Sequence, residues 1–115
     1  MVGRTFRFAQ AVRAFVNRLP RSISNYEDFR QLVRSSGSVA ANYLEAQEGL
    51  SRKDFFYRIK VCRKESRESG LWLRLVDLGP EPDVGSERTR LVAEADELKL
   101  IFASIAGKDD TNDAA

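Results

Sequence analysis

Two pairs of polar residues have the spacing needed to share one side of a helix. Asn42 and Glu45 lie three residues apart, and so do Glu65 and Glu68, which makes the members of each pair neighbours on a helical surface. Clustered carboxylates could bind a divalent metal or share a proton. They could equally form an ion-paired network that fixes the register of two helices. Arg34, Arg63 or Lys64 could supply the cations of such a network. We expect a structural polar network made of Arg34, Asn42, Glu45, Glu65 and Glu68.

The chain contains no histidine. This composition excludes a histidine general base, a Ser-His-Asp triad and the Glu-x-x-His ligand pairs of di-iron bundles. The single cysteine, Cys62, cannot form an intramolecular disulfide and occupies an apolar helical position, as a small core residue would. We therefore expect no enzymatic activity, no metal and no cofactor.

Lysines and arginines follow one side of the segment over residues 52–76. At about 100° per residue, five of them fall within an arc of roughly 80°. Such a face of one sign fits the phosphates of nucleic acid, although it could also be ordinary solvated surface. Phe56, Tyr57 and Leu75 lie near the same arc and could stack on bases or contact another subunit. The predicted nucleic-acid-binding residues are Arg52, Lys53, Lys60, Lys64, Arg67 and Arg74.

Four segments must position these residues, and each has the apolar period of a helix. Apolar or small residues recur at spacings of three and four, and no segment has strand patterning. The four stripes are Phe8, Val12, Phe15 and Leu19; Phe29, Leu32, Ser36, Val39, Tyr43 and Ala46; Phe55, Ile59, Cys62, Ser66, Ser69, Leu73 and Val76; and Leu91, Ala95, Leu98, Phe102 and Ile105.

Start and stop residues separate the four segments. Pro20 ends the first, and Asn25 is the predicted N-cap of the second, which Gly49 terminates. Ser51 with Asp54 resembles a capping box that opens the third segment, and Ser86 is the predicted N-cap of the fourth. Short loops between amphipathic helices predict an all-α, antiparallel up-down-up-down four-helix bundle over residues 1–106. Residues 107–115 are expected to form a disordered polar tail.

Small residues cluster in the middle of the second and third helices. Gly37 lies in the second and Gly70 in the third, with serines and alanines around both. A glycine within a helix costs about 1 kcal/mol relative to alanine, so a packing reason is expected. We expect these two helices to approach each other most closely there.

The net charge of +2 hides an asymmetry. Residues 1–75 carry 15 Lys/Arg and 7 Asp/Glu, whereas residues 76–115 carry 4 and 10. The basic part is consistent with an anionic partner. No apolar run approaches the roughly 18 residues of a membrane-spanning helix, and no secretory signal is evident. We expect a cytoplasmic protein that does not contact membrane.

Three sequence elements carry a resemblance to a known family. They are Ala41-Asn42-x-x-Glu45-Ala46, Ser51-x-x-Asp54-Phe55 and Lys64-Glu65-x-x-Glu68. Together they resemble the bacterial four-helix-bundle family named for proteins encoded in intervening sequences of 23S ribosomal RNA genes. The resemblance covers the chain from Phe6 to about Ile105. The loop from Pro20 to Asn25 is shorter than in relatives, so contacts of a longer loop are not carried over.

The resemblance implies a bacterial or archaeal cytosolic protein that forms a homo-oligomeric ring, often a pentamer. It assigns no biochemical role. The family is similar to the accessory proteins of diversity-generating retroelements, which are basic pentameric bundles that bind nucleic acid and partner a reverse transcriptase.

Residues and resemblance together predict a non-enzymatic, self-assembling scaffold. Its expected activity is binding of RNA or DNA through the basic face of the third helix. The alternative is a protein–protein interaction scaffold or adaptor, including an accessory partner of a reverse transcriptase. Salt separates the two, because phosphate binding weakens steeply with salt and apolar docking does not.

Overall fold

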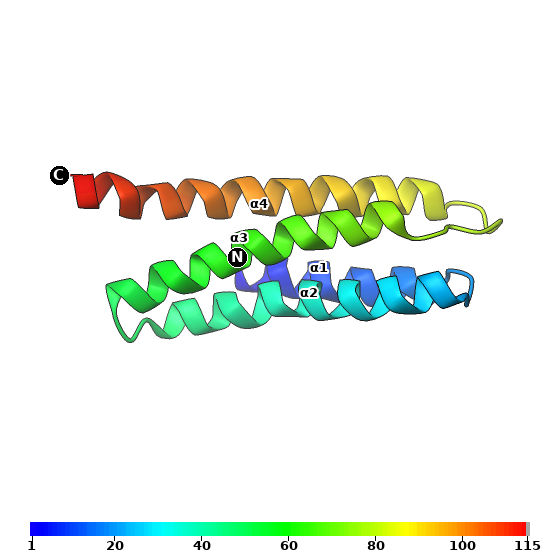
Figure 1. Ribbon diagram of the computed structural model, residues 1–115, viewed down its shortest axis with the longest axis horizontal. Coiled ribbons are helices and arrows are strands. Elements are labelled where there is room, and N and C mark those ends of the chain that lie inside the picture. The colour runs from blue at the N-terminus through cyan, green and yellow to red at the C-terminus, as the bar shows by residue number, and fades with distance from the viewer. Residues whose placement is uncertain (115) are drawn as a thin grey trace.

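The computed structural model describes residues 1–114, with side chains as far as Asp109, and within this range it contains four helices and no strand (Figure 1). The helices are α1 (Val2–Val16), α2 (Ile23–Glu48), α3 (Arg52–Leu75) and α4 (Val84–Ala114). Successive helices run in opposite directions along a body 54 Å long. The predicted all-α four-helix bundle is confirmed.

The four helices do not cover one another equally. α2 packs between α1 and α3, α3 packs against α4, and α1 has only a small contact with α4. α1 has 15 residues and α4 has 31, so at about 1.5 Å per residue α1 is roughly half as long. The end of the bundle that contains the α2–α3 connection is therefore built from three helices (Figure 1).

The predicted apolar stripes form the core. Phe15, Leu32, Ile59, Leu98 and Phe102 are among its largest fully buried side chains. Phe29, Tyr43, Phe55 and Ile105 are partly buried and pack against it. Every other apolar residue of the four stripes is buried, and so are Ser36, Ser66 and Ser69. The helical period in the sequence therefore identified the buried face of each helix correctly.

Two of the predicted helix starts require correction. α2 begins at Ile23 with Ser22 as its N-cap, whose side chain accepts a hydrogen bond from the Asn25 backbone N–H. Asn25 lies within the helix and is fully buried, so it is not the cap. α4 begins at Val84, two residues before the predicted cap, after Asp83 adopts a left-handed conformation with φ of 72°. The Ser86 hydroxyl instead donates to the Asp83 carbonyl.

Two other predicted boundaries agree with the structure. Gly49 ends α2 in a left-handed conformation, with φ of 50°. Ser51 caps α3 by accepting a hydrogen bond from the Asp54 backbone N–H at 3.0 Å. These boundaries follow from local chemistry: glycine tolerates positive φ, and a serine oxygen satisfies a free N–H at the helix start.

The C-terminal end of α4 differs from the sequence-based expectation. The helix continues beyond residue 106 to Ala114, where a disordered tail was expected from Gly107. The Asp109 carboxylate lies against the start of α3, 3.2 Å from Arg52 Nη1 and 3.3 Å from Lys60 Nζ. A composition too polar for the core is therefore compatible with a helix that docks through ion pairs.

The two glycines of the small-residue cluster face other helices than expected, whereas its serines lie between α2 and α3. A Cβ on Gly37 would lie 3.2 Å from Arg13 of α1, and one on Gly70 would lie 3.8 Å from the Ala95 Cβ of α4. Serines make the close α2–α3 contact, with the Ser35 and Ser69 hydroxyl oxygens 2.8 Å apart. Over residues 1–114, none of the helices combines the length and the apolar character of a membrane-spanning segment.

Candidate nucleic-acid interface

Basic residues gather in an open groove of about 1150 Å³ between α3 and α4. Six cationic side chains and one carboxylate line this α3/α4 groove, together with an apolar floor. Its cations are Lys60, Arg63, Lys64, Arg67, Arg74 and Lys99, its acid is Glu68, and its floor includes Tyr57, Val61, Leu71, Leu100 and Ala103. Four of the six predicted nucleic-acid-binding residues thus lie in one groove, while Arg52 and Lys53 lie outside its lining.

Acidic side chains partly neutralise the predicted basic face. Asp109 of α4 pairs with both Arg52 and Lys60, and Asp96 of α4 lies 3.2 Å from Arg74 Nη2. Lys64 Nζ is 3.9 Å from Glu68 on the same helix. The three pairs that α4 makes were not predicted, because the partners in each pair lie more than 20 positions apart in the sequence.

The remaining predicted cations are exposed. Arg67 lies in the groove and Lys53 at the start of α3, and neither forms an ion pair with another described residue. The same holds for Arg63, which was not among the predicted binding residues but lines the groove. Arg63 and Arg67 therefore provide the uncompensated positive charge of the α3/α4 groove.

Apolar side chains remain exposed along the groove floor. Tyr57 is 59%, Leu71 47% and Leu100 65% exposed. Phe56 is half-buried instead, with its ring against Phe55 and beneath the Arg52 guanidinium. Trp72 packs against the core. Of the three apolar residues expected near the basic arc of α3, Tyr57 and Leu75 are exposed.

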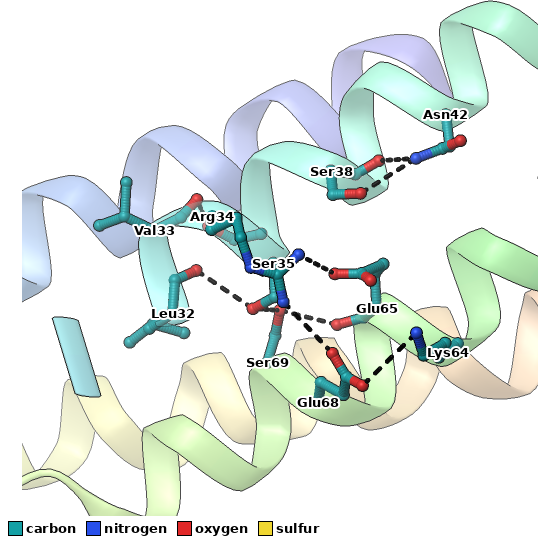
Figure 2. Close-up of polar contacts among 11 residues, drawn as sticks. Leu32, Val33, Arg34, Ser35, Ser38, Asn42, Lys64, Glu65, Glu68 and Ser69 are labelled. Carbon is teal, nitrogen blue, oxygen red and sulfur yellow. Dashed lines mark hydrogen bonds and ion pairs between the residues drawn. The ribbon is translucent and has the colours of Figure 1, made fainter. Parts of the chain in front are cut away.

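The predicted polar network joins α2 to α3 around Arg34 (Figure 2). The Arg34 guanidinium lies 3.3 Å from the buried Glu65 carboxylate and 3.5 Å from Glu68. The Ser69 hydroxyl, which contacts Ser35, also donates to the Glu65 backbone carbonyl at 2.9 Å. Charged and neutral hydrogen bonds thus fix the register of the two helices at one level.

Asn42 belongs to a separate cluster. Its Nδ2 donates to the Ser38 carbonyl and hydroxyl (Figure 2), and its Oδ1 accepts from Arg58 Nη1 at 3.1 Å. Arg58 also lies 3.8 Å from Asp54, a four-residue helical spacing that could have indicated this partner. Glu45 is exposed and has no ion pair with another described residue. The structure therefore separates two of the five predicted network residues from Arg34.

A further ion-paired cluster lies between α1 and α4. Arg4 Nε and Nη2 donate to the two carboxylate oxygens of Glu94 at 2.8 and 2.7 Å, and Glu97 is 3.0 Å from Nη2. Hydrogen bonds with Glu94 and then Glu97 raise the pKa of Arg4 above its ordinary value. This cluster anchors the start of the short α1 and was not predicted from the sequence.

The single thiol of the chain, that of Cys62, is buried in the core. Burial raises the pKa of the Cys62 thiol to about 12, so the thiol is protonated at neutral pH. Among the described residues, no group of three His, Cys, Asp or Glu side chains is placed to hold a metal ion.

Comparison with known proteins supports the fold. No protein-family model and no curated protein matches the chain. A solved structure from Bacteroides thetaiotaomicron, a protein of unknown function from the S23 ribosomal protein family, is 24% identical and superposes with a TM-score of 0.77. The match covers 91% of this chain and 96% of that protein. None of these comparisons shows a link to diversity-generating retroelements. The chain therefore shares its four-helix fold with a protein of the S23 ribosomal protein family.

Proposed function

We propose that this protein is a non-enzymatic, self-assembling bundle that binds nucleic acid in the α3/α4 groove. The observation that carries the proposal is the charge of the groove lining, which has six cations and one carboxylate. Arg63 and Arg67 are the primary phosphate contacts, because no acid among the described residues neutralises them. A planar guanidinium can donate two parallel hydrogen bonds to one phosphate.

The paired cations make a second set of contacts. Lys60 and Arg74 reach the groove but also contact Asp109 and Asp96. A phosphate must compete with these carboxylates, so each paired cation contributes less than Arg63 or Arg67. Exposed ion pairs are worth about 0.2–1 kcal/mol, so a phosphate can displace them.

The apolar floor favours single strands over duplex. Tyr57 exposes its ring beside the cations, and an aromatic ring can stack on an unpaired base. Stacking on a base is worth about 1–3 kcal/mol and is tolerant of sequence. We expect binding with little sequence preference and a preference for single-stranded RNA or DNA.

A salt titration with a matched pair of variants tests the proposal. Fluorescence anisotropy measures binding of a labelled single-stranded RNA between about 50 and 200 mM salt. In Arg63→Glu/Arg67→Glu, we expect affinity to fall at least about tenfold and the logarithmic salt slope to decrease by about 1.4, because two phosphate contacts are lost. The control, Arg30→Glu/Arg90→Glu, makes the same change in net charge at exposed arginines outside the groove.

Two outcomes would overturn nucleic-acid binding. One is no measurable binding by the parent at about 50 mM salt, and the other is an equal loss of affinity in the control double variant. Docking of another protein is then the better account, and the exposed side chains of Leu71 and Leu100 favour it. Such docking would be insensitive to salt, and a reverse transcriptase is one partner to test.

A further inference from the structure

The N-terminal segment carries positive charge that lies outside the α3/α4 groove. Residues 1–26 contain five arginines and no aspartate or glutamate. Arg4 pairs with Glu94 of α4. Arg18 pairs with Glu81 of the α3–α4 connection. The other three are exposed and form no ion pair with any residue that the structure describes: Arg7, Arg13 and Arg21. The segment is therefore a second concentration of uncompensated positive charge.

The side of α1 that faces away from the core carries two of these arginines. At about 100° per residue, seven outward residues span an arc of roughly 120°, opposite the buried Phe8, Val12 and Phe15. They form the outer face of α1: Gly3, Phe6, Arg7, Gln10, Arg13, Ala14 and Asn17. All seven are exposed, and none is acidic. The face thus combines two cations with two amides and one aromatic ring.

These side chains match the parts of a single nucleic-acid strand. A guanidinium donates paired hydrogen bonds to phosphate, an amide both donates and accepts as base edges do, and an exposed ring stacks on a base. The Phe6 side chain is 61% exposed. Arg13 is partly held in place, because its Nη1 donates to the Ala9 carbonyl at 3.0 Å. Its Nη2 lies over Gly37 of α2, 3.2 Å from the position of a Cβ.

A second copy of the chain matches this face less well than phosphate does. Acids outnumber cations in residues 76–115, but the carboxylates of α4 are engaged within the chain. Asp96 and Asp109 pair with cations of α3, and Glu94 pairs with Arg4. A nucleic-acid strand instead offers one negative charge at every nucleotide.

α1 and α3 lie at opposite corners of the bundle. α2 and α4 each contact both of them, whereas over residues 1–114 α1 and α3 do not contact each other. The outer face of α1 therefore points away from the α3/α4 groove, across a body with a cross-section of 24 × 20 Å. Nucleic acid on the two surfaces would be two strands, or two distant segments of one strand.

We propose that the outer face of α1 is a second binding surface for single-stranded RNA or DNA, so that the protein bridges two strands. It is the weaker surface, because it is open and offers two or three cations where the groove offers six. Holding two strands on one small bundle raises their local concentration, which favours pairing of complementary sequences. Bridging rests on the proposed function, whereas binding at α1 does not.

Fluorescence anisotropy with a labelled oligouridylate tests binding at α1. The groove variant, Arg63→Glu/Arg67→Glu, should retain weak binding with a logarithmic salt slope of about −1.4 to −2.1, as two or three phosphate contacts require. Adding the α1 variant, Arg7→Glu/Arg13→Glu, should weaken this residual binding at least about tenfold. If the parent binds and the groove variant shows no residual binding, the α1 surface is overturned.

A matched control separates the face from net charge. Arg30→Glu/Arg90→Glu, added to the groove variant, should change the residual affinity less than about threefold. Arg7→Gln/Arg13→Gln introduces no acid and should still weaken it, so the test does not depend on how well the α1 variant folds. Equal losses in the control and the α1 variant would overturn the proposal. A groove variant that binds like the parent would refute only the groove.

Capture of a second strand tests the bridging. Biotinylated oligouridylate on beads is incubated with the protein and a fluorescent oligouridylate, which cannot pair with it. The parent should retain the fluorescent strand, and the α1 variant should retain at least about fivefold less although its groove still binds. Equal retention would mean that several grooves of one assembly hold the strands, and it would overturn bridging by α1. In light scattering, a changed oligomer mass of the α1 variant at unchanged RNA affinity would make this face a contact between copies instead.

Discussion

The Asn25 side chain forms hydrogen bonds with both backbone groups of Asp77, 52 positions further along the chain. Its Nδ2 donates to the Asp77 carbonyl at 2.9 Å, and its Oδ1 accepts from the Asp77 N–H at 2.8 Å. Nδ2 also donates to the Pro20 carbonyl at 2.9 Å. One fully buried amide thus ties the α1–α2 connection to the α3–α4 connection at the same end of the bundle.

Replacing this amide should be costly. We expect Asn25→Ala to lower the free energy of unfolding by about 2–4 kcal/mol, because it removes three hydrogen bonds and leaves buried backbone groups without partners. Urea denaturation measures the change. Ser24→Ala, at an exposed neighbour, should cost less than about 0.5 kcal/mol. Equal effects of the two substitutions would contradict the structural role of Asn25.

Two serines one turn apart on α3 should respond in opposite ways to alanine. Ser66 Oγ is buried with no hydrogen-bond partner, whereas Ser69 Oγ bonds to Ser35 and to the Glu65 carbonyl. We expect Ser66→Ala to raise stability by about 1 kcal/mol and Ser69→Ala to lower it by about 1–2 kcal/mol. Thermal denaturation of both variants checks the signs. A loss of stability in Ser66→Ala would show that its hydroxyl has a partner.

The ion pair of Arg34 with buried Glu65 should contribute more to stability than the exposed pair of Arg30 with Glu27. Arg34→Ala leaves the buried Glu65 carboxylate without its cation, and we expect a loss of about 1–3 kcal/mol. Arg30→Ala, which removes an exposed pair with Glu27 on the same helix, should cost less than about 0.5 kcal/mol. Urea denaturation compares them. Equal losses would mean that the α2–α3 ion pair does not contribute beyond an ordinary surface pair.

The sequence predicted the helices better than the side-chain contacts between them. The period of three and four residues identified every buried stripe, because burial on a helix repeats along the chain. Asn25 was predicted as a cap because asparagine is common there, yet its partner Asp77 is distant in sequence. The same reason explains why Asp96 and Asp109 were missed. Which acid reaches which cation depends on how α4 packs on α3, and local spacing does not specify that.

Two aspartates of α4 contact the basic face of α3. Asp96 pairs with Arg74, and Asp109 pairs with Arg52 and Lys60. If nucleic acid binds in the α3/α4 groove, these carboxylates compete with its phosphates. Asp96→Asn/Asp109→Asn should therefore strengthen RNA binding, and we expect a gain of about three- to tenfold at about 50 mM salt.

A matched variant separates release of the cations from a general change in charge. Glu45→Gln/Glu48→Gln also removes two acids, from the exposed surface of α2, so long-range attraction rises equally in both double variants. We expect the RNA affinity of the α2 variant to rise less than about twofold. Increasing salt should abolish this gain before it abolishes the gain of Asp96→Asn/Asp109→Asn, because salt screens long-range attraction. The melting temperatures should change little, because partly exposed ion pairs contribute at most about 1 kcal/mol each.

If both variants gained equally, the groove would have no special role in binding. If Asp96→Asn/Asp109→Asn bound more weakly than the parent, the ion pairs with α4 would be holding the cations in their binding positions.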